Sequence, residues 1–151
     1  ALLLILTSLA PLHARAQDHQ VQAAIIAAMK SGDGAAAIKG LIRAGYVNQK
    51  PRKRADYVDY RAFNKPLTLA GATLVTIEEE YLTKYIGCCV NEGIGLVARV
   101  ETDAGALTTL ANTAGCAIRD EDAVNESLAN SGVRRRGGRH VYISCRANDR
   151  K

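Results

Sequence analysis

Apolar positions recur with a helical period in two segments that follow residue 18. Over 19–30 they form one stripe of a helix, which consists of Val21, Ala24, Ile25, Ala28 and Met29. Over 35–44 a shorter stripe predicts a second helix, with Asp33 as its N-cap and Gly45 at its end. Because only a few residues separate the two stripes, we expect an N-terminal helical hairpin.

Alternating or β-branched positions predict four strands, over 56–63, 72–77, 94–101 and 140–146. The segment 78–86 suits either a helix or a continuation of the strand before it, and we expect a long, bent strand. Pro51 indicates an irregular linker over 48–54, and 116–118 is predicted to be a short apolar connection. Two further helices are expected, over 104–113 with Thr102 or Asp103 as cap, and over 120–131 with Asp120 as cap.

Helices and strands therefore come in runs, which is typical of α+β proteins. We predict an N-terminal helical hairpin, a small, mostly antiparallel sheet of about four strands and two further helices, stapled by disulfides. Residues 17–151 would form a single globular domain. Its core would consist of Ala, Leu, Ile and Val, because the chain contains one Phe and no Trp.

The beginning of the chain resembles an export signal in its pattern. Residues 1–12 are an apolar run, and Ala14 and Ala16 follow in the spacing of small residues that signal peptidase cleaves. We therefore predict that 1–16 are part of a signal peptide, that cleavage falls before Gln17, and that the protein is bacterial, periplasmic or secreted. The apolar run is shorter than the roughly 20 residues of a spanning helix, so the processed protein is expected not to span a membrane.

Four cysteines, Cys88, Cys89, Cys116 and Cys145, indicate a disulfide framework in an exported chain. A bond between the neighbours 88 and 89 would close a strained ring and is disfavoured. Two patterns remain open: Cys88–Cys116 with Cys89–Cys145, or Cys88–Cys145 with Cys89–Cys116. A zinc site of all four cysteines is disfavoured, because structural zinc sites space their paired ligands by two or more residues.

The chain carries a formal net charge of +5, and two short runs concentrate its cations. The first run holds Lys50, Arg52, Lys53 and Arg54, and the second holds Arg134, Arg135, Arg136 and Arg139. Guanidinium groups bind phosphate and carboxylate through paired hydrogen bonds, so these residues are candidates for contacts with an anionic partner. The simpler interpretation is two solvated loops. Aromatic residues do not interleave with the cations, so we predict no specific nucleic-acid partner.

Candidate catalytic residues are few. Glu79 and Glu80, in the acidic run that starts at Glu78, are the carboxylates that an envelope hydrolase could use, although a solvated strand edge is the favoured interpretation. His140 is the histidine nearest to a hydroxyl, that of Ser144, but along a strand the two residues would lie about 13 Å apart. No metal, nucleotide or other cofactor motif is present, so we predict no cofactor and no metal.

These observations favour a non-enzymatic protein-binding module of the inhibitor or immunity type, with a protein partner that is acidic or an anionic component of the envelope. The alternatives are a cell-envelope hydrolase that uses Glu79 or Glu80, and a surface protein that binds anions or lipopolysaccharide. The shape of the molecule discriminates between them. A hydrolase needs a cleft that gathers these carboxylates with His140 or another polar partner, whereas a binder needs a rigid face, on which Tyr57, Tyr60 and Tyr81 are further candidates.

Overall fold

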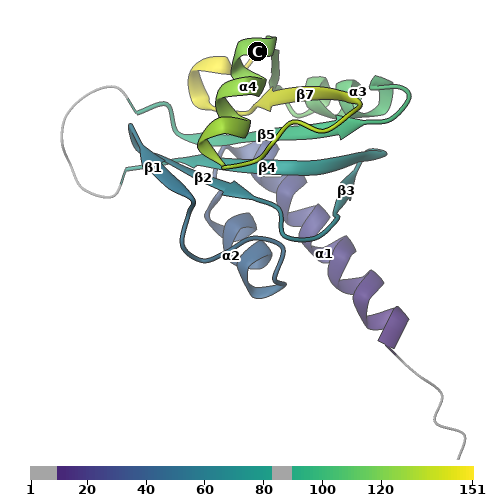
Figure 1. Ribbon diagram of the computed structural model, residues 1–151. Coiled ribbons are helices and arrows are strands. Elements are labelled where there is room, and N and C mark those ends of the chain that lie inside the picture. The colour runs from purple at the N-terminus through teal and green to yellow at the C-terminus, as the bar shows by residue number, and fades with distance from the viewer. Residues whose placement is uncertain (1–9, 83–89) are drawn as a thin grey trace, which may run out of the picture.

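The computed structural model describes residues 10–82 and 90–151 and has the α+β architecture that the sequence predicts (Figure 1). Its helices are α1 (Ala10–Ser31), α2 (Ala35–Arg43), α3 (Gly105–Thr113) and α4 (Glu121–Asn130), and a 3-10 turn, η1, spans Ala147–Asp149. Its strands are β1 (Lys53–Ala55), β2 (Val58–Ala62), β3 (Thr68–Leu69), β4 (Ala72–Glu80), β5 (Gly93–Val100), β6 (Ala117–Arg119) and β7 (Arg139–Ser144).

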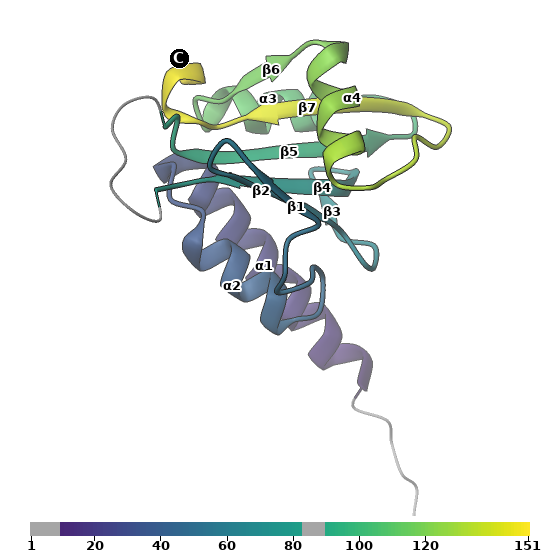
Figure 2. The same ribbon diagram turned by 60° about the vertical axis from the view of Figure 1, so that its left-hand side comes forward.

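The strands form one antiparallel sheet in the order β1-β2-β4-β5-β7-β6, and β3 pairs with β4 outside this path. Helices cover both faces: Figures 1 and 2 show α4 on one face and α1 with α2 on the other. Successive residues of a strand point to opposite faces, and β5 uses both. Leu96 belongs to the larger core with α1, α2 and α3, whereas Val97 packs with Val124 and Leu128 of α4.

The four helices lie where periodicity predicts them, although α1 is longer and runs through the expected cleavage site. Asp120 caps α4 as predicted, because its side chain accepts a hydrogen bond from the amide of Ala123 (3.1 Å). Asp33 and Asp103 stand one position too early to be the N-caps. Each instead accepts a hydrogen bond from the amide two residues later, at Ala35 and Gly105.

The prediction of about four strands was wrong, because the described residues form seven. The expected strand 56–63 is confirmed only for 58–62, because its first two residues, Asp56 and Tyr57, form a two-residue hairpin turn with positive φ values of 47° and 69°. The strand before this turn, β1, lies inside the segment that we expected to be an irregular linker. Pro51 does not prevent it, because the first ladder bond comes from the amide of Arg52 to Tyr60 (2.8 Å).

Two further short strands were missed, namely β3 and β6, and β6 occupies the expected connection at 116–118. The strand prediction for 78–86 is confirmed only for 78–80, where β4 ends. Residues 83–86 lie outside the described part of the chain.

One disulfide joins Cys116 to Cys145, so both predicted pairing patterns were wrong. The reason is the register of β6 against β7. Ala117 pairs with Ser144, and the next pair along this antiparallel ladder is therefore Cys116 with Cys145, whose Cα atoms are 4.4 Å apart. Cys88 and Cys89 lie outside the described residues.

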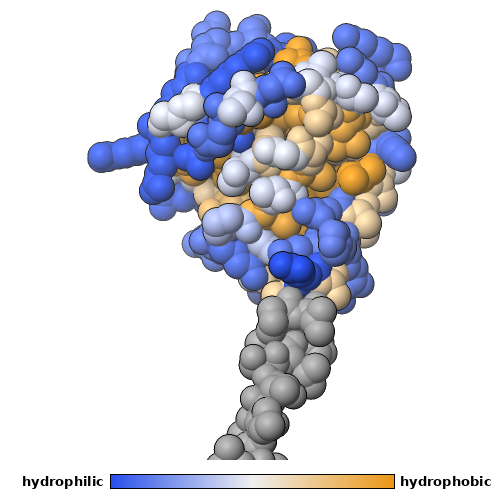
Figure 3. Space-filling model, turned by 90° about the vertical axis from the view of Figure 1, so that its right-hand side faces the viewer, coloured by the Kyte–Doolittle hydropathy of each residue, from blue (hydrophilic) through white to orange (hydrophobic). Residues whose placement is uncertain are grey.

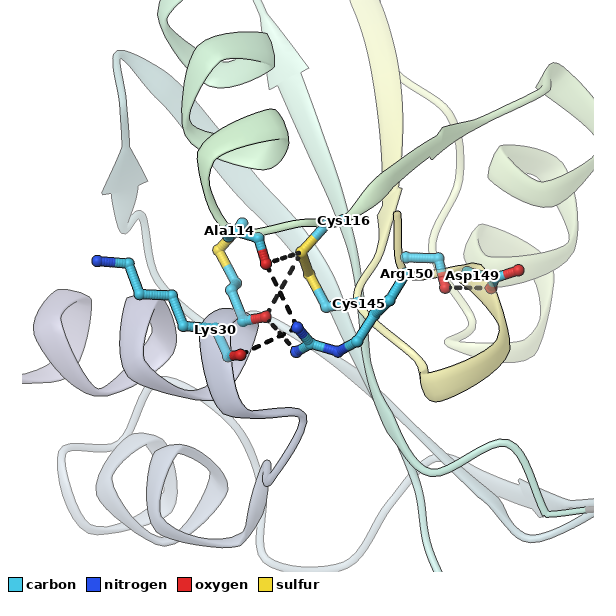
Figure 4. Close-up of a disulfide and its surroundings, with 8 residues drawn as sticks. Lys30, Ala114, Cys116, Cys145, Asp149 and Arg150 are labelled. Carbon is cyan, nitrogen blue, oxygen red and sulfur yellow. Dashed lines mark hydrogen bonds between the residues drawn. A yellow bond between two sulfur atoms is a disulfide. The ribbon is translucent and has the colours of Figure 1, made fainter.

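Arg150 links two helix ends beside this disulfide (Figure 4). Its guanidinium donates hydrogen bonds to the carbonyls of Met29 and Lys30 at the end of α1, and to that of Ala114 after α3 (2.5, 2.9 and 3.4 Å). The last carbonyls of a helix have no partner within the helix and carry partial negative charge, so a cation suits this position. The disulfide and Arg150 together hold α1, α3 and the C-terminal segment.

The surface is largely hydrophilic around a central apolar area on the side shown in Figure 3. Among large apolar side chains of the described residues, Leu82 and Ile118 are exposed, at 43% and 41%. Within the same part of the chain, no helix combines the length and the apolar character that crossing a membrane requires.

Replacing both Cys116 and Cys145 by Ser should lower the free energy of unfolding by about 3–4 kcal/mol, because the bond closes a long loop of the unfolded chain. The two cysteines are 29 positions apart. Urea unfolding of the oxidised wild type and of the double variant measures this difference. A peptide map should recover a Cys116–Cys145 crosslink, and a loss below about 1 kcal/mol would contradict a structural role for the bond.

Candidate anion-binding groove

The fold brings the two basic runs of the sequence side by side. Lys53 Nζ donates a hydrogen bond to the side chain of Asn130 at the end of α4 (2.8 Å). Arg52 lies against Gly132, where a Cβ atom would come within 2.8 Å of Arg52 Nε. Gly132 also has a positive φ of 68°, so glycine meets both demands of this position. The segment before β1 and the loop after α4 are therefore neighbours.

Two open cavities adjoin along this contact. The edge cavity, of about 460 Å³, lies beside β2 and is lined by Asn48, Lys50, Pro51, Arg52, Arg61, Ala62, Asn64 and Ser131. The arginine cavity, of about 650 Å³, is lined by Phe63, Asn64, Lys65, Pro66, Thr73, Val75, Arg99, Gly132, Val133, Arg134, Arg136 and His140. Asn64 belongs to both linings, and Ser131 of the first precedes Gly132 of the second. We call the two together the basic groove.

Buried polar atoms without a partner gather in the walls of the basic groove. Among the described residues, five buried side-chain atoms have no hydrogen-bond partner, and two of them, Arg99 Nε and Arg146 Nε, lie in ion pairs with Glu101 and Glu80. The other three, Arg61 Nη1, Ser131 Oγ and His140 Nδ1, belong to residues that line the basic groove. The three residues are 6%, 3% and 5% exposed. Leaving such an atom unpaired costs about 1–3 kcal/mol, so folded proteins pair nearly all of them. Exceptions are expected at functional sites, where local rules of stability are broken.

The Arg61 guanidinium is held in one orientation. Its Nε and Nη2 donate hydrogen bonds to the carbonyls of Asn48 and Gln49 (3.3 and 3.2 Å), and Nη2 also pairs with the Asp59 carboxylate (3.2 Å). Asp59 is shared, because it accepts hydrogen bonds from Arg54 and Tyr81 as well (2.9 Å each). Arg61 is therefore a preorganised cation at the edge of the sheet.

The groove contains four of the eight basic residues that the sequence analysis selected: Lys50, Arg52, Arg134 and Arg136. The others are directed elsewhere or lie outside the linings. Lys53 binds Asn130, Arg54 pairs with Asp59 and stacks on Tyr81, Arg135 pairs with Glu121, and Arg139 lines neither cavity.

Sequence reasoning missed Arg61, Lys65, Arg99 and Ser131, and it considered His140 only as a candidate for catalysis. A signal for Arg61 existed, since it interrupts the apolar pattern of 56–63. For the other four, only the pairing of distant segments places them at the groove.

The groove is strongly positive. Its cations are Lys50, Arg52, Arg61, Lys65, Arg99, Arg134 and Arg136, and no Asp or Glu of the described residues appears in either lining. Two carboxylates outside the linings offset part of this charge, Asp59 beside Arg61 and Glu101 beside Arg99 (3.1 Å). A concave surface lined by charge of one sign attracts ligands of the opposite sign.

The positive charge of the groove affects the pKa of His140. Burial lowers the pKa of its imidazole below the ordinary value, the positive charges of Arg135 and Arg99 lower it further, and the backbone of Gly138 offsets part of the shift. The neutral imidazole is therefore favoured in the folded protein. An anion in the arginine cavity would offset the cations and favour the protonated form.

The acidic candidates lie at the other end of the sheet. In the register of β4, β5 and β7, Glu79 pairs with Ile94, whereas Thr73 pairs with Arg99 and Arg99 with His140. Glu79 and His140 are thus separated by six residues along the strands, or about 20 Å. Glu79 borders a cavity of about 730 Å³ with Asp33, Glu92 and Lys39 among its lining residues. The structure does not bring Glu79 or Glu80 together with His140.

Glu78 and Glu80 bind the C-terminal segment. Glu78, which is 3% exposed, accepts hydrogen bonds from Tyr142 Oη (3.0 Å) and Arg146 Nη2 (2.5 Å), and Arg146 Nε also lies 3.3 Å from Glu80. Burial raises the pKa of Glu78, although Arg146, Ser127 and Tyr142 oppose this shift. The ion pair borders a polar cavity of about 240 Å³ beneath α4. We interpret it as a structural anchor, since buried ion pairs commonly specify one packing arrangement.

No group of three or more His, Cys, Asp or Glu within 10–82 and 90–151 is arranged to hold a metal ion. Comparison with protein-family models, with curated proteins and with solved structures found no match.

The lowered pKa of His140 predicts a pH-dependent stability. Near pH 6.5 and below, the unfolded chain binds a proton at this site more readily than the folded protein, so this contribution to stability falls as the pH falls through that range. Urea unfolding between pH 7.5 and 5.5 should therefore show a smaller acid-induced loss for His140→Asn than for the wild type. The buried carboxylates cancel in this comparison because both proteins contain them. Equal losses would contradict the shift.

Proposed function

We propose that this protein is a non-enzymatic binding module that holds an anionic partner in the basic groove. One observation carries the proposal: Arg61 Nη1, Ser131 Oγ and His140 Nδ1, all buried and without a partner among the described residues, belong to walls whose other charged residues are all Lys or Arg. A bound anion would offset the repulsion among these cations, which the isolated protein must tolerate.

Binding explains the groove better than catalysis does. The polar groups of the groove are cations, amides, the hydroxyls of Thr73 and Ser131 and one imidazole, and no carboxylate or thiol of the described residues lines it beside His140. The separation of Glu79 from His140 likewise gives the hydrolase alternative no support. The Arg61 guanidinium, which its hydrogen bonds to Asn48, Gln49 and Asp59 hold in one orientation, suits a surface that recognises a partner.

The partner is an acidic protein or an anionic component of the cell envelope. A protein inhibitor or immunity protein is one member of this class, because such proteins act by occupying a partner and need no reactive centre. The Arg54 guanidinium stacks on the ring of Tyr81, so this ring is not free to stack on a partner. We therefore place the contact with the partner at the basic groove and not at the candidate tyrosines.

Replacing Arg134 and Arg136 together by Gln should weaken capture of the partner about tenfold, a change that corresponds to about 1.4 kcal/mol. Both side chains are exposed and form no hydrogen bond or ion pair with other described residues, so folding should be unaffected. The measurement is the amount of envelope component retained by the immobilised protein, and the salt concentration that releases it. Screening between exposed charges predicts release as salt rises.

The matched control is Lys39→Gln with Arg43→Gln, which removes the same charge from exposed positions on α2. It should retain the partner as the wild type does. Equal retention by all three proteins, or retention that salt does not weaken, would contradict the proposal.

We further propose that the module acts outside the cytoplasm. The Ala14-x-Ala16 pattern supports export, and the Cys116–Cys145 disulfide is compatible with an oxidising compartment. Mass spectrometry of protein purified from the periplasm or medium should find Gln17 at the N-terminus. Recovery of uncleaved protein from the cytoplasm alone would contradict export.

A further inference from the structure

We propose that the basic groove recognises phosphoryl groups and takes one in each of its two cavities. This inference rests on the proposed function and names the chemistry of the ligand. The phosphoryl groups could belong to a soluble phosphate ester or to the headgroups of an anionic lipid, and the experiment below separates these sources.

The first argument is the number and type of donors. The edge cavity combines the guanidiniums of Arg52 and Arg61 with the Lys50 ammonium and the Ser131 hydroxyl. A phosphate monoester presents three acceptor oxygens and about −1.5 to −2 charge at pH 7, whereas a carboxylate presents two oxygens and a single charge. Such a set of cations and donors exceeds what one carboxylate can use.

The second argument is the predominance of arginine. Five of the seven cations of the groove are arginines: Arg52, Arg61, Arg99, Arg134 and Arg136. The planar guanidinium fork matches the oxygens of a phosphate and is more weakly hydrated than an ammonium group. Arg61 is also preorganised by its contacts with Asn48, Gln49 and Asp59, so little freedom is lost on binding.

The third argument is the division into two cavities. Each cavity has its own cations and at least one buried atom without a described partner. These atoms are Arg61 Nη1 and Ser131 Oγ in the edge cavity and His140 Nδ1 in the arginine cavity. Asn64 lies between them as a shared lining residue. The apolar side chains of Phe63, Val75 and Val133 line the arginine cavity and offer contact to an uncharged scaffold that joins two phosphoryl groups.

A matched pair of probes tests this arrangement. Fructose 1,6-bisphosphate carries two phosphoryl groups on one sugar, and fructose 6-phosphate carries one. Calorimetric titration at fixed ionic strength should show the bisphosphate binding at least about tenfold more tightly. Arg52→Gln, in the edge cavity, and Arg136→Gln, in the arginine cavity, should each reduce this advantage to less than about threefold, and Lys39→Gln on α2 should preserve it.

Two further arms identify the source and the chemistry. Vesicles of phosphatidylglycerol, compared with phosphatidylcholine, report binding to lipid headgroups, and glutarate reports binding to paired carboxylates. Binding of the sugar bisphosphate alone supports a soluble phosphate ester. Binding of the phosphatidylglycerol vesicles that both arginine variants weaken supports a lipid surface.

The inference is overturned if the two sugar phosphates bind equally, if glutarate binds as tightly as the bisphosphate, or if neither phosphate probe nor vesicle binds. If the envelope partner is still retained through Arg134 and Arg136 in that case, the proposed function stands and only the phosphoryl chemistry is wrong. If that retention is absent as well, both proposals fail.

Discussion

The antiparallel register of β4, β5 and β7 determines where charge lies on this molecule. Pairing Glu79 with Ile94 places the acidic end of β4 beside the start of β5. The same ladder then pairs Arg99 with both Thr73 and His140 at the opposite end. Since a register shift of one residue would also exchange the two faces of the sheet, the apolar residues that fill both cores fix this arrangement. Glu79 and His140 are thereby separated by about the length of a strand.

This separation has opposite consequences at the two ends. At the acidic end, Arg146 neutralises Glu78 and Glu80, so the carboxylates become part of the scaffold. At the basic end, cations outnumber the carboxylates that reach them, and three buried polar atoms have no described partner. The first arrangement stabilises the folded protein on its own, whereas the second, by our proposal, would gain stability from a bound anion. The disulfide and Arg150, which join α1, α3 and the C-terminal segment, hold the fold together independently of the groove.

The sequence predicted the helices well because each carries its own apolar stripe, and it predicted the cap at Asp120 because capping is a local interaction. It did not predict β1, β3 and β6, which have two or three residues each and exist because a longer neighbour offers them a ladder. The disulfide pairing failed for the same reason: Cys116 meets Cys145 through the β6–β7 register, which no local pattern encodes. Runs of charged residues can be recognised in a sequence, and half of the basic residues that were selected in this way line the groove. Arg61 and Ser131 were missed, and His140 was considered only for catalysis, because only tertiary packing buries these residues at the groove.

The location of the binding site is the central claim, and backbone amide chemical shifts measured during titration with the anionic ligand test it most directly. The account predicts that shifts concentrate in 48–52, 61–66 and 131–140, the segments that form the two cavities. Amides around Glu79 on β4 and along α2 should remain unchanged. Shifts confined to the polar cavity beneath α4, around Tyr60, Glu78 and Arg146, would contradict it and place the site at the anchor of the C-terminal segment instead.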